Sequence, residues 1–315
     1  MIAMSFIIVC HIFQAYGNEL AFWFNVGVQL FLIISGYLYY TKDYSNESVL
    51  RILKQQFIKI LLPYYVWLGI VIVIYLLFSP QSLTTISVIY SFFCSGTLLG
   101  QGHLWFIPYI LLCYLITPYL YYIKRKIHNT NLISTSIIWL IILGCIFIIM
   151  KLYKSYFKPE IISCYIIGYA IADIFSRFKR NNIRNKITFI ICMAAIVFNA
   201  IKIYYCYFYK SELAGVFALI FAYFKSYTHV VLGLSIFLLF IHLCNNVKYN
   251  KILSFSDKYS YEIYLVHALF ILSPLNLIFI SDYVILNIVM AIVSTIICGM
   301  LLKYISSYIS SVKFI

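Results

Sequence analysis

The chain has 315 residues, of which 64% are hydrophobic and only 10% are charged, and its mean hydropathy is +0.97. A water-soluble domain carries about a quarter charged residues, so this composition excludes a soluble globular protein and indicates an integral membrane protein. The formal net charge of +14 is typical of basic cytoplasmic loops that face anionic lipid, and no separate soluble stretch is long enough to bind a nucleic acid.

The apolar segments predict an all-α membrane protein. Backbone polar groups in lipid must bond within their own segment, and about 20 helical residues cross the bilayer. We expect about ten transmembrane helices in a single domain covering residues 1–315. They lie near residues 1–14, 25–41, 60–78, 104–122, 133–150, 160–175, 187–201, 226–244, 260–279 and 284–302. The apolar stretch 212–224 is either an eleventh span or a re-entrant or interfacial piece.

The distribution of basic residues predicts which ends of the spans face the cytoplasm. With the N-terminus inside, 17 of the 23 Lys and Arg residues fall in inner loops and the C-terminal tail, and 6 fall in outer regions. The outer loop 79–103 contains none. Cytoplasmic loops carry an excess of Lys and Arg, so both termini are predicted to be cytoplasmic.

The first span contains the pair Cys10-His11 and is short. Its fourteen residues rise about 21 Å, less than the roughly 30 Å of the hydrocarbon core. An imidazole within the membrane is costly, which makes His11 a candidate functional residue. Imidazole titrates near neutral pH, which suits a general base that takes a proton from a hydroxyl. The alternative is a neutral His that hydrogen-bonds between helices.

The second span contains a small-residue break, Ser35-Gly36. Small residues allow two helices to approach closely, so helix packing is the favoured interpretation. A nucleophilic Ser35 is the alternative, although no base lies at a local spacing that would activate it. Ser35 is kept as a candidate for contact with a substrate.

Basic residues lead into the third span. Arg51, Lys54 and Lys59 precede the run Leu61-Leu62-Pro63-Tyr64. One interpretation is a positive anchor on the inner side of the membrane. The other is a phosphate-binding face for an anionic donor from the cytosol, such as a CoA nucleotide.

Two further spans carry His residues. His103 and Trp105 begin the fourth span at its outer end, where Trp suits the membrane interface. The outer end of the first span is on the same side, so His103 and His11 are candidates to converge. Glu262 and His267 both enter the ninth span, but they are five residues apart and do not share a helix face well. Structural hydrogen bonding is their favoured interpretation.

The nine Cys residues are scattered, and no CxxC or Cys/His cluster is present. We therefore expect no bound metal. Cys94 and Cys206 fall in predicted outer regions, where they either pair or remain free thiols.

Together these motifs resemble the acyltransferase-3 family of membrane-bound acyltransferases, which O-acetylate bacterial surface sugars. The matching segments, in the order of the family, are Ile2-Ala3 through Val9-Cys10-His11, Val28 to Tyr37, Leu61-Leu62-Pro63-Tyr64, His103-Leu104-Trp105-Phe106, and Tyr259 to His267. The family has about ten helices with cytoplasmic ends, which agrees with the charge count.

The resemblance implies an enzyme of the bacterial plasma membrane. It would move an acetyl group, with acetyl-CoA as the expected donor and no bound cofactor, to a sugar hydroxyl of a surface polysaccharide or its lipid-linked precursor. His11 is the expected catalytic base. The other candidate residues would bind the donor's phosphates or line the substrate site: Arg51, Lys54, Lys59, Ser35, Tyr64, His103 and Trp105.

One feature of the family has no counterpart in this sequence. The family usually has a basic residue eleven positions before the catalytic His, and counting back from His11 leads to a position just before Met1. Either the natural start lies upstream, or the protein has lost a residue that helps to hold the donor. In the second case the protein is impaired, or it only scaffolds other envelope enzymes.

The alternative function is a transporter or flippase of a lipid-linked saccharide without acyl-transfer chemistry. Such a protein predicts a polar path through several helices at mid-depth. The intramembrane ionisable residues here are few, and no inverted repeat or pair of broken helices is evident in the sequence.

Overall fold

The computed structural model describes residues 2–44, 48–152, 158–177, 181–208, 215–244 and 251–311, without the side chains of residues 181–183, 252, 253 and 256. Every regular element within these ranges is a helix, which confirms the all-α prediction.

Eight helical stretches in the described ranges are long and apolar enough to cross a membrane. They are Ala21–Thr41, Val49–Phe78, Gly102–Lys126, Leu132–Leu152, Pro159–Arg177, Arg184–Phe208, Gly215–Leu243 and Val284–Ser311. The apolar helix α1 (Ile2–Ala15) is shorter, and α11 (Lys251–Ile271) is not among the eight. The count of ten therefore stays a prediction, as do the sides of the termini.

Several predicted boundaries are wrong. The stretch 212–224 forms no separate span, because its described part belongs to α10 (Gly215–Leu243). The short span 187–201 is the middle of a 28-residue helix, α9 (Asn181–Phe208). The ninth span was expected at 260–279, but α11 begins earlier and ends at Ile271.

The described contacts divide the chain into two compact units. Unit 1 comprises Met1–Asn25, Glu47–Leu115 and Lys248–Ile315, and unit 2 comprises Val26–Asn46 and Ile116–Val247. The prediction of one domain over residues 1–315 stays a prediction.

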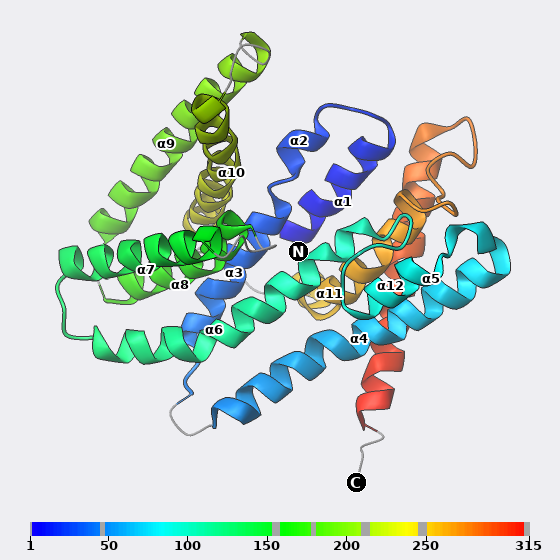
Figure 1. Ribbon diagram of the computed structural model, residues 1–315, viewed down its shortest axis with the longest axis horizontal. Helices are drawn as coiled ribbons and strands as arrows, with labels where there is room; N and C mark the ends of the chain where they lie inside the picture. The colour runs from blue at the N-terminus through cyan, green and yellow to red at the C-terminus, as the bar shows by residue number, and fades with distance from the viewer. Residues whose placement is uncertain are drawn as a thin grey trace. The chain divides into compact units, whose positions relative to one another are not determined.

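Unit 1 contains the first and last helices of the chain. Its elements are α1, α2 (Ala21–Phe24), α4 (Val49–Phe78), η1 (Pro80–Ser82), α5 (Thr85–Phe92), η2 (Gly102–Trp105), the first part of α6 (Phe106–Lys126), α11 and α12 (Val284–Ser311). Figure 1 shows α1 and α2 joined at the start of the chain, and these two helices pack against each other.

Helices α4 and α11 run parallel within unit 1. The Tyr261 hydroxyl donates to the Ile60 carbonyl at 2.8 Å, and Tyr75, fifteen residues further along α4, lies beside Ser273 just beyond the end of α11. Helix α12 covers α11 through an ion pair of 2.9 Å between Lys303 and the buried Glu262. The charge of Glu262 is therefore compensated inside the unit.

Unit 2 is built on α3 (Gly27–Thr41) and α8 (Pro159–Arg177), which approach each other very closely. A Cβ atom placed on Gly36 would lie 1.9 Å from the Tyr165 carbonyl oxygen, and one on Gly168 would lie 2.0 Å from that of Ile33. The Ser35-Gly36 break thus serves helix packing, as the sequence favoured. The rest of α6, α7 (Leu132–Leu152), α9 and α10 complete the unit, in which α9 and α10 lie side by side (Figure 1).

Candidate active site

Three histidines from three separate elements gather in unit 1. His11 comes from α1, His103 from η2 and His267 from α11. The ring centroids are 4.9 Å apart for His11 and His267, 4.7 Å for His103 and His267, and 6.2 Å for His11 and His103. Sequence reasoning brought His103 and His11 together, but it assigned His267 to structural hydrogen bonding.

A chain of hydrogen bonds fixes which ring nitrogen of each histidine carries a proton. His267 Nδ1 lies 2.6 Å from the Tyr264 carbonyl oxygen, which can only accept, so this nitrogen donates. In a neutral ring, His267 Nε2 is then an acceptor. It lies 2.8 Å from His11 Nδ1, so His11 Nδ1 is the donor. The remaining nitrogen of neutral His11, Nε2, consequently keeps a free lone pair.

Two of the three histidines are buried, and the third is partly exposed. His267 is 0% exposed and His103 is 6% exposed, whereas His11 is partly exposed. His11 is therefore the most exposed of the three histidines. His267 acts from behind it and holds its orientation.

His103 presents a second acceptor nitrogen. Its Nε2 lies 3.2 Å from the Leu265 carbonyl oxygen and must donate to it, which leaves Nδ1 as an acceptor. This nitrogen is buried and has no hydrogen-bond partner among the described residues. The hydroxyl of Tyr264 donates to the His103 carbonyl and ties η2 to α11.

The surrounding backbone explains why the three elements meet. Gly100, just before η2, has φ +73°, and a Cβ atom on it would lie 2.3 Å from the Cα of Ser273. Only glycine permits both this conformation and this approach. The C-terminal turns of α1 pack on α11 through Ile12 and Ile271, and the Tyr16 hydroxyl donates to the Ile278 carbonyl at 3.1 Å.

The three basic residues predicted to bind the donor lie on α4. The distribution of Lys and Arg in the sequence predicts that they are on the cytoplasmic side of the histidines. Arg51, Lys54 and Lys59 are all exposed. Because α4 and α11 are parallel and Ile60 contacts Tyr261, the rise of 1.5 Å per residue places Arg51 about 22 Å, and Lys59 about 10 Å, from the level of His267. These residues do not touch the histidines, and the structure leaves them free to contact a solute.

The remaining candidates have different surroundings. Tyr64 is fully buried, and its hydroxyl donates to the Ser91 carbonyl. Trp105 is 36% exposed and packs edge-on against Tyr109, with ring centroids 5.2 Å apart. Ser35 is 8% exposed and lies in unit 2, next to the Gly36 contact with α8.

His267 is the residue that sequence reasoning undervalued. Its signal was present, since a second ionisable side chain within a predicted span is uncommon. Its partner is 256 positions away in the sequence, so no local spacing reveals the pair.

Comparison with known proteins gives one match. The sequence model of the acyltransferase-3 family, described as an acyltransferase domain, matches residues 1–304, which is almost the whole chain. No curated protein and no solved structure matches the chain significantly.

Proposed function

Because the chain belongs to the acyltransferase-3 family, we propose that it is a membrane O-acyltransferase that moves an acetyl group from acetyl-CoA to a sugar hydroxyl. The acceptor is a surface polysaccharide or its lipid-linked precursor, and the membrane is the bacterial plasma membrane. The observation that carries this proposal is the hydrogen-bond chain from the Tyr264 carbonyl through His267 to His11. It leaves one basic nitrogen on a partly exposed ring.

The reaction follows from the tautomers. The acceptor hydroxyl donates its hydrogen bond to His11 Nε2 and attacks the carbonyl carbon of the thioester, while its proton passes to Nε2. The positive charge of the imidazolium strengthens its Nδ1–H bond to His267. The C–S bond then breaks, the leaving thiolate takes the proton from Nε2, and an ester and a free thiol result.

The exposed basic residues of α4 suit the donor. In acetyl-CoA the phosphates and the thioester lie at opposite ends of a long arm, so the phosphate site must be well separated from the base. Arg51, Lys54 and Lys59 offer cations about 10–22 Å from the level of His267 on the predicted cytoplasmic side. Cations on that side would hold the phosphates while the thioester reaches His11.

The experiment is acetyl incorporation into surface polysaccharide in cells that carry a single variant. In His11→Asn, the side-chain amide can still donate to His267 but has no basic nitrogen. We expect acetylation to fall by about 10²–10⁴-fold, the usual contribution of a general base. His242→Gln, at an exposed position on the last turn of α10, is the matched control and should retain full activity. Undiminished acetylation by His11→Asn at normal protein levels would remove His11 as the base.

A further inference from the structure

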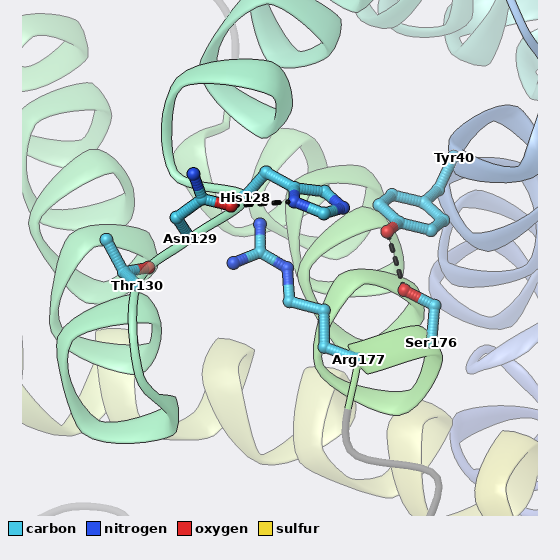
Figure 2. A pocket seen from close by; sticks show the side chains of 6 residues that line it. All are labelled: Tyr40, His128, Asn129, Thr130, Ser176 and Arg177. Atoms are coloured by element: carbon cyan, nitrogen blue, oxygen red, sulfur yellow. Dashed lines mark hydrogen bonds between the residues drawn. The ribbon is translucent and has the colours of Figure 1, made fainter.

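Unit 2 contains a polar pocket that the proposed acyl transfer does not use. Its volume is about 360 Å³, which is within the range of small-molecule sites. Figure 2 shows the side chains that line it: Tyr40, His128, Asn129, Thr130, Ser176 and Arg177. They come from the C-terminal ends of α3 and α8 and from the connection between α6 and α7. The pocket is therefore at the ends of apolar helices, which is where spans leave the membrane.

Arg177 is the central residue of this pocket. Its side chain is only 9% exposed, and its Nε donates to Asp173 at 2.8 Å. Nη1 donates to the Ile127 carbonyl and lies 3.3 Å from Thr135 Oγ1. Nη2 is buried and has no partner among the described residues. A guanidinium has five N–H donors, so the two on Nη2 are left for an acceptor.

Two other nitrogens on the pocket wall are also available. His128 Nδ1 lies 3.2 Å from Asn129 Oδ1 and donates to it, so the Nε2 of a neutral His128 is an acceptor, and Asn129 Nδ2 is a donor that remains for other contacts. Both residues are exposed. The donors that the lining offers to a ligand with several acceptor oxygens are therefore Arg177 Nη2 and Asn129 Nδ2.

The charges around the pocket favour an anion. The last turn of α6 contributes Lys124, Arg125 and Lys126 in addition to Arg177. Lys124 Nζ donates to the Tyr40 carbonyl at 2.8 Å and lies 3.8 Å from the centre of its ring, which fixes that wall. Asp173 is already bound by the Trp139 indole at 2.9 Å as well as by Arg177. Its negative charge is thus largely compensated by donors of the protein.

We infer that this pocket binds the phosphate group of an anionic ligand. Basic pockets between helices at the cytoplasmic end of a membrane protein suit the headgroup of an anionic lipid, and the sequence predicts this end to be cytoplasmic. A soluble phosphate is the other source of the same chemistry. Guanidinium and amide donors match phosphate oxygens in either case.

The test measures binding to the purified full-length protein in a neutral detergent at constant ionic strength. The probes are inorganic phosphate, dihexanoyl phosphatidylglycerol and, as the zwitterionic comparison without net charge, dihexanoyl phosphatidylcholine. We expect the wild type to bind phosphatidylglycerol more tightly than phosphatidylcholine. Binding of inorganic phosphate as well would identify the phosphate alone as sufficient, and its absence would identify the lipid headgroup as the source.

Matched variants locate the site. Asn129→Asp places a carboxylate on the pocket wall and should weaken anion binding by about tenfold. Asn131→Asp adds the same charge two residues further along the chain, at a position that does not line the pocket. Its carboxylate can still accept the hydrogen bond from Ser134 N, which is 2.8 Å long in the wild type. It should bind within about twofold of the wild type. Arg177→Lys keeps a cation beside Asp173, removes Nη2, and should also weaken binding.

Three results would overturn the proposal. They are no binding of either anionic probe, equal binding of both lipids without binding of inorganic phosphate, or equal binding of the anionic probe by Asn129→Asp and Asn131→Asp. Asn129 and Asn131 are both exposed, so their substitution by Asp should not disturb the fold. The comparison of these two variants therefore tests the proposal even if Arg177→Lys does not fold.

Discussion

In the proposed reaction, the hydrogen bond between His11 and His267 makes His11 an oriented base. His267 does not reach the substrate in this scheme, and it acts by accepting the Nδ1 proton of His11. We expect His267→Leu to lower acetyl transfer by at least about tenfold, because His11 can then adopt the tautomer that has no lone pair on Nε2. His267→Gln should recover part of the activity, since its amide oxygen can accept the same proton.

The measurement for His267 is acetylation rate against pH for both variants, with protein level as the control. A purely structural role would lower the amount of folded protein but leave the pH profile of the remaining activity unchanged. Full activity of His267→Leu, or equal loss in the Leu and Gln variants at normal protein levels, would contradict the positioning role.

Cys94 provides a second prediction at the residue scale. It lies between α5 and η2, it is a free thiol that is 5% exposed, and burial raises the pKa of its thiol to about 11. The thiolate is the reactive form, so at pH 8 its alkylation should be on the order of a hundredfold slower than that of an ordinary thiol. The rate should still rise about tenfold per pH unit at pH 9, where an ordinary thiol approaches its plateau.

Iodoacetamide labelling followed by mass spectrometry of each cysteine peptide checks this expectation. Cys244, which is exposed just beyond the end of α10, is the internal reference. A plateau for Cys94 below pH 9, or a rate equal to that of Cys244, would show that the thiol is not shielded.

The sequence could identify candidate residues for the chemistry, but not their tautomers or their hydrogen-bond partners. His11 was recognisable because an imidazole in an apolar helix is rare. Its tautomer depends on the Tyr264 carbonyl, which acts through His267, and that information exists only in the folded structure. The sequence also could not show the surroundings of Tyr64, because its buried hydroxyl donates to the carbonyl of Ser91 in α5, 27 positions further along the chain.

At the scale of the element, the contact between α3 and α8 depends on glycine. Gly36→Ala would place a Cβ atom 1.9 Å from the Tyr165 carbonyl oxygen, and a backbone group cannot rotate away as a side chain can. We expect a loss larger than the about 1–3 kcal/mol that is typical of overpacking, and little folded protein. Gly144→Ala on α7 is the control, because no atom lies within 4 Å of its added Cβ.

Size-exclusion chromatography and thermal unfolding in detergent measure both variants. Gly144→Ala should match or exceed the wild type, since alanine favours a helix by about 1 kcal/mol over glycine. A Gly36→Ala protein with the yield and the Tm of the wild type would show that α3 and α8 are further apart than described.

Helix existence was predictable, whereas helix length was not. Apolar runs locate the part of a helix that lies in lipid, but helices continue wherever residues favour them. Helix α4 begins at Val49 because Ser48 caps Arg51 N, and its basic first turns consist of good helix formers. Lys202 and Lys225 lie just outside the predicted spans 187–201 and 226–244, but they are within α9 and α10, and Lys202 is 1% exposed.

At the scale of the whole molecule, the sequence contains no marker of the two compact units. The chain passes between them after Asn25, Asn46, Leu115 and Val247. The third of these crossings falls in the middle of α6, where no linker composition can appear. Unit boundaries of this kind follow from long-range contacts, and a search for Gly- or Pro-rich linkers cannot find them.

The number of membrane crossings decides the side of the C-terminus. Eight helices qualify by length and composition, and α1 and α11 together would restore the predicted ten. Helix α11 has 21 residues, which rise about 31 Å, and the 13 residues after its charged first turns rise about 20 Å, close to the length of α1. Its charges do not prevent a crossing, because Lys251, Asp257 and Lys258 lie in its first turns and Glu262 is paired with Lys303.

We therefore expect α11 to cross the membrane and the C-terminus to be cytoplasmic. Alkaline phosphatase, which is active only outside the cytoplasm, should be active when fused after residue 282 and inactive when fused after residue 247 or at the C-terminus. A fusion in the loop 79–103, which contains no Lys or Arg, is the positive control. Equal activity of the fusions after residues 247 and 282 would mean that α11 does not cross the membrane. His267 and the turn that contains Tyr264 would then lie outside the hydrocarbon core.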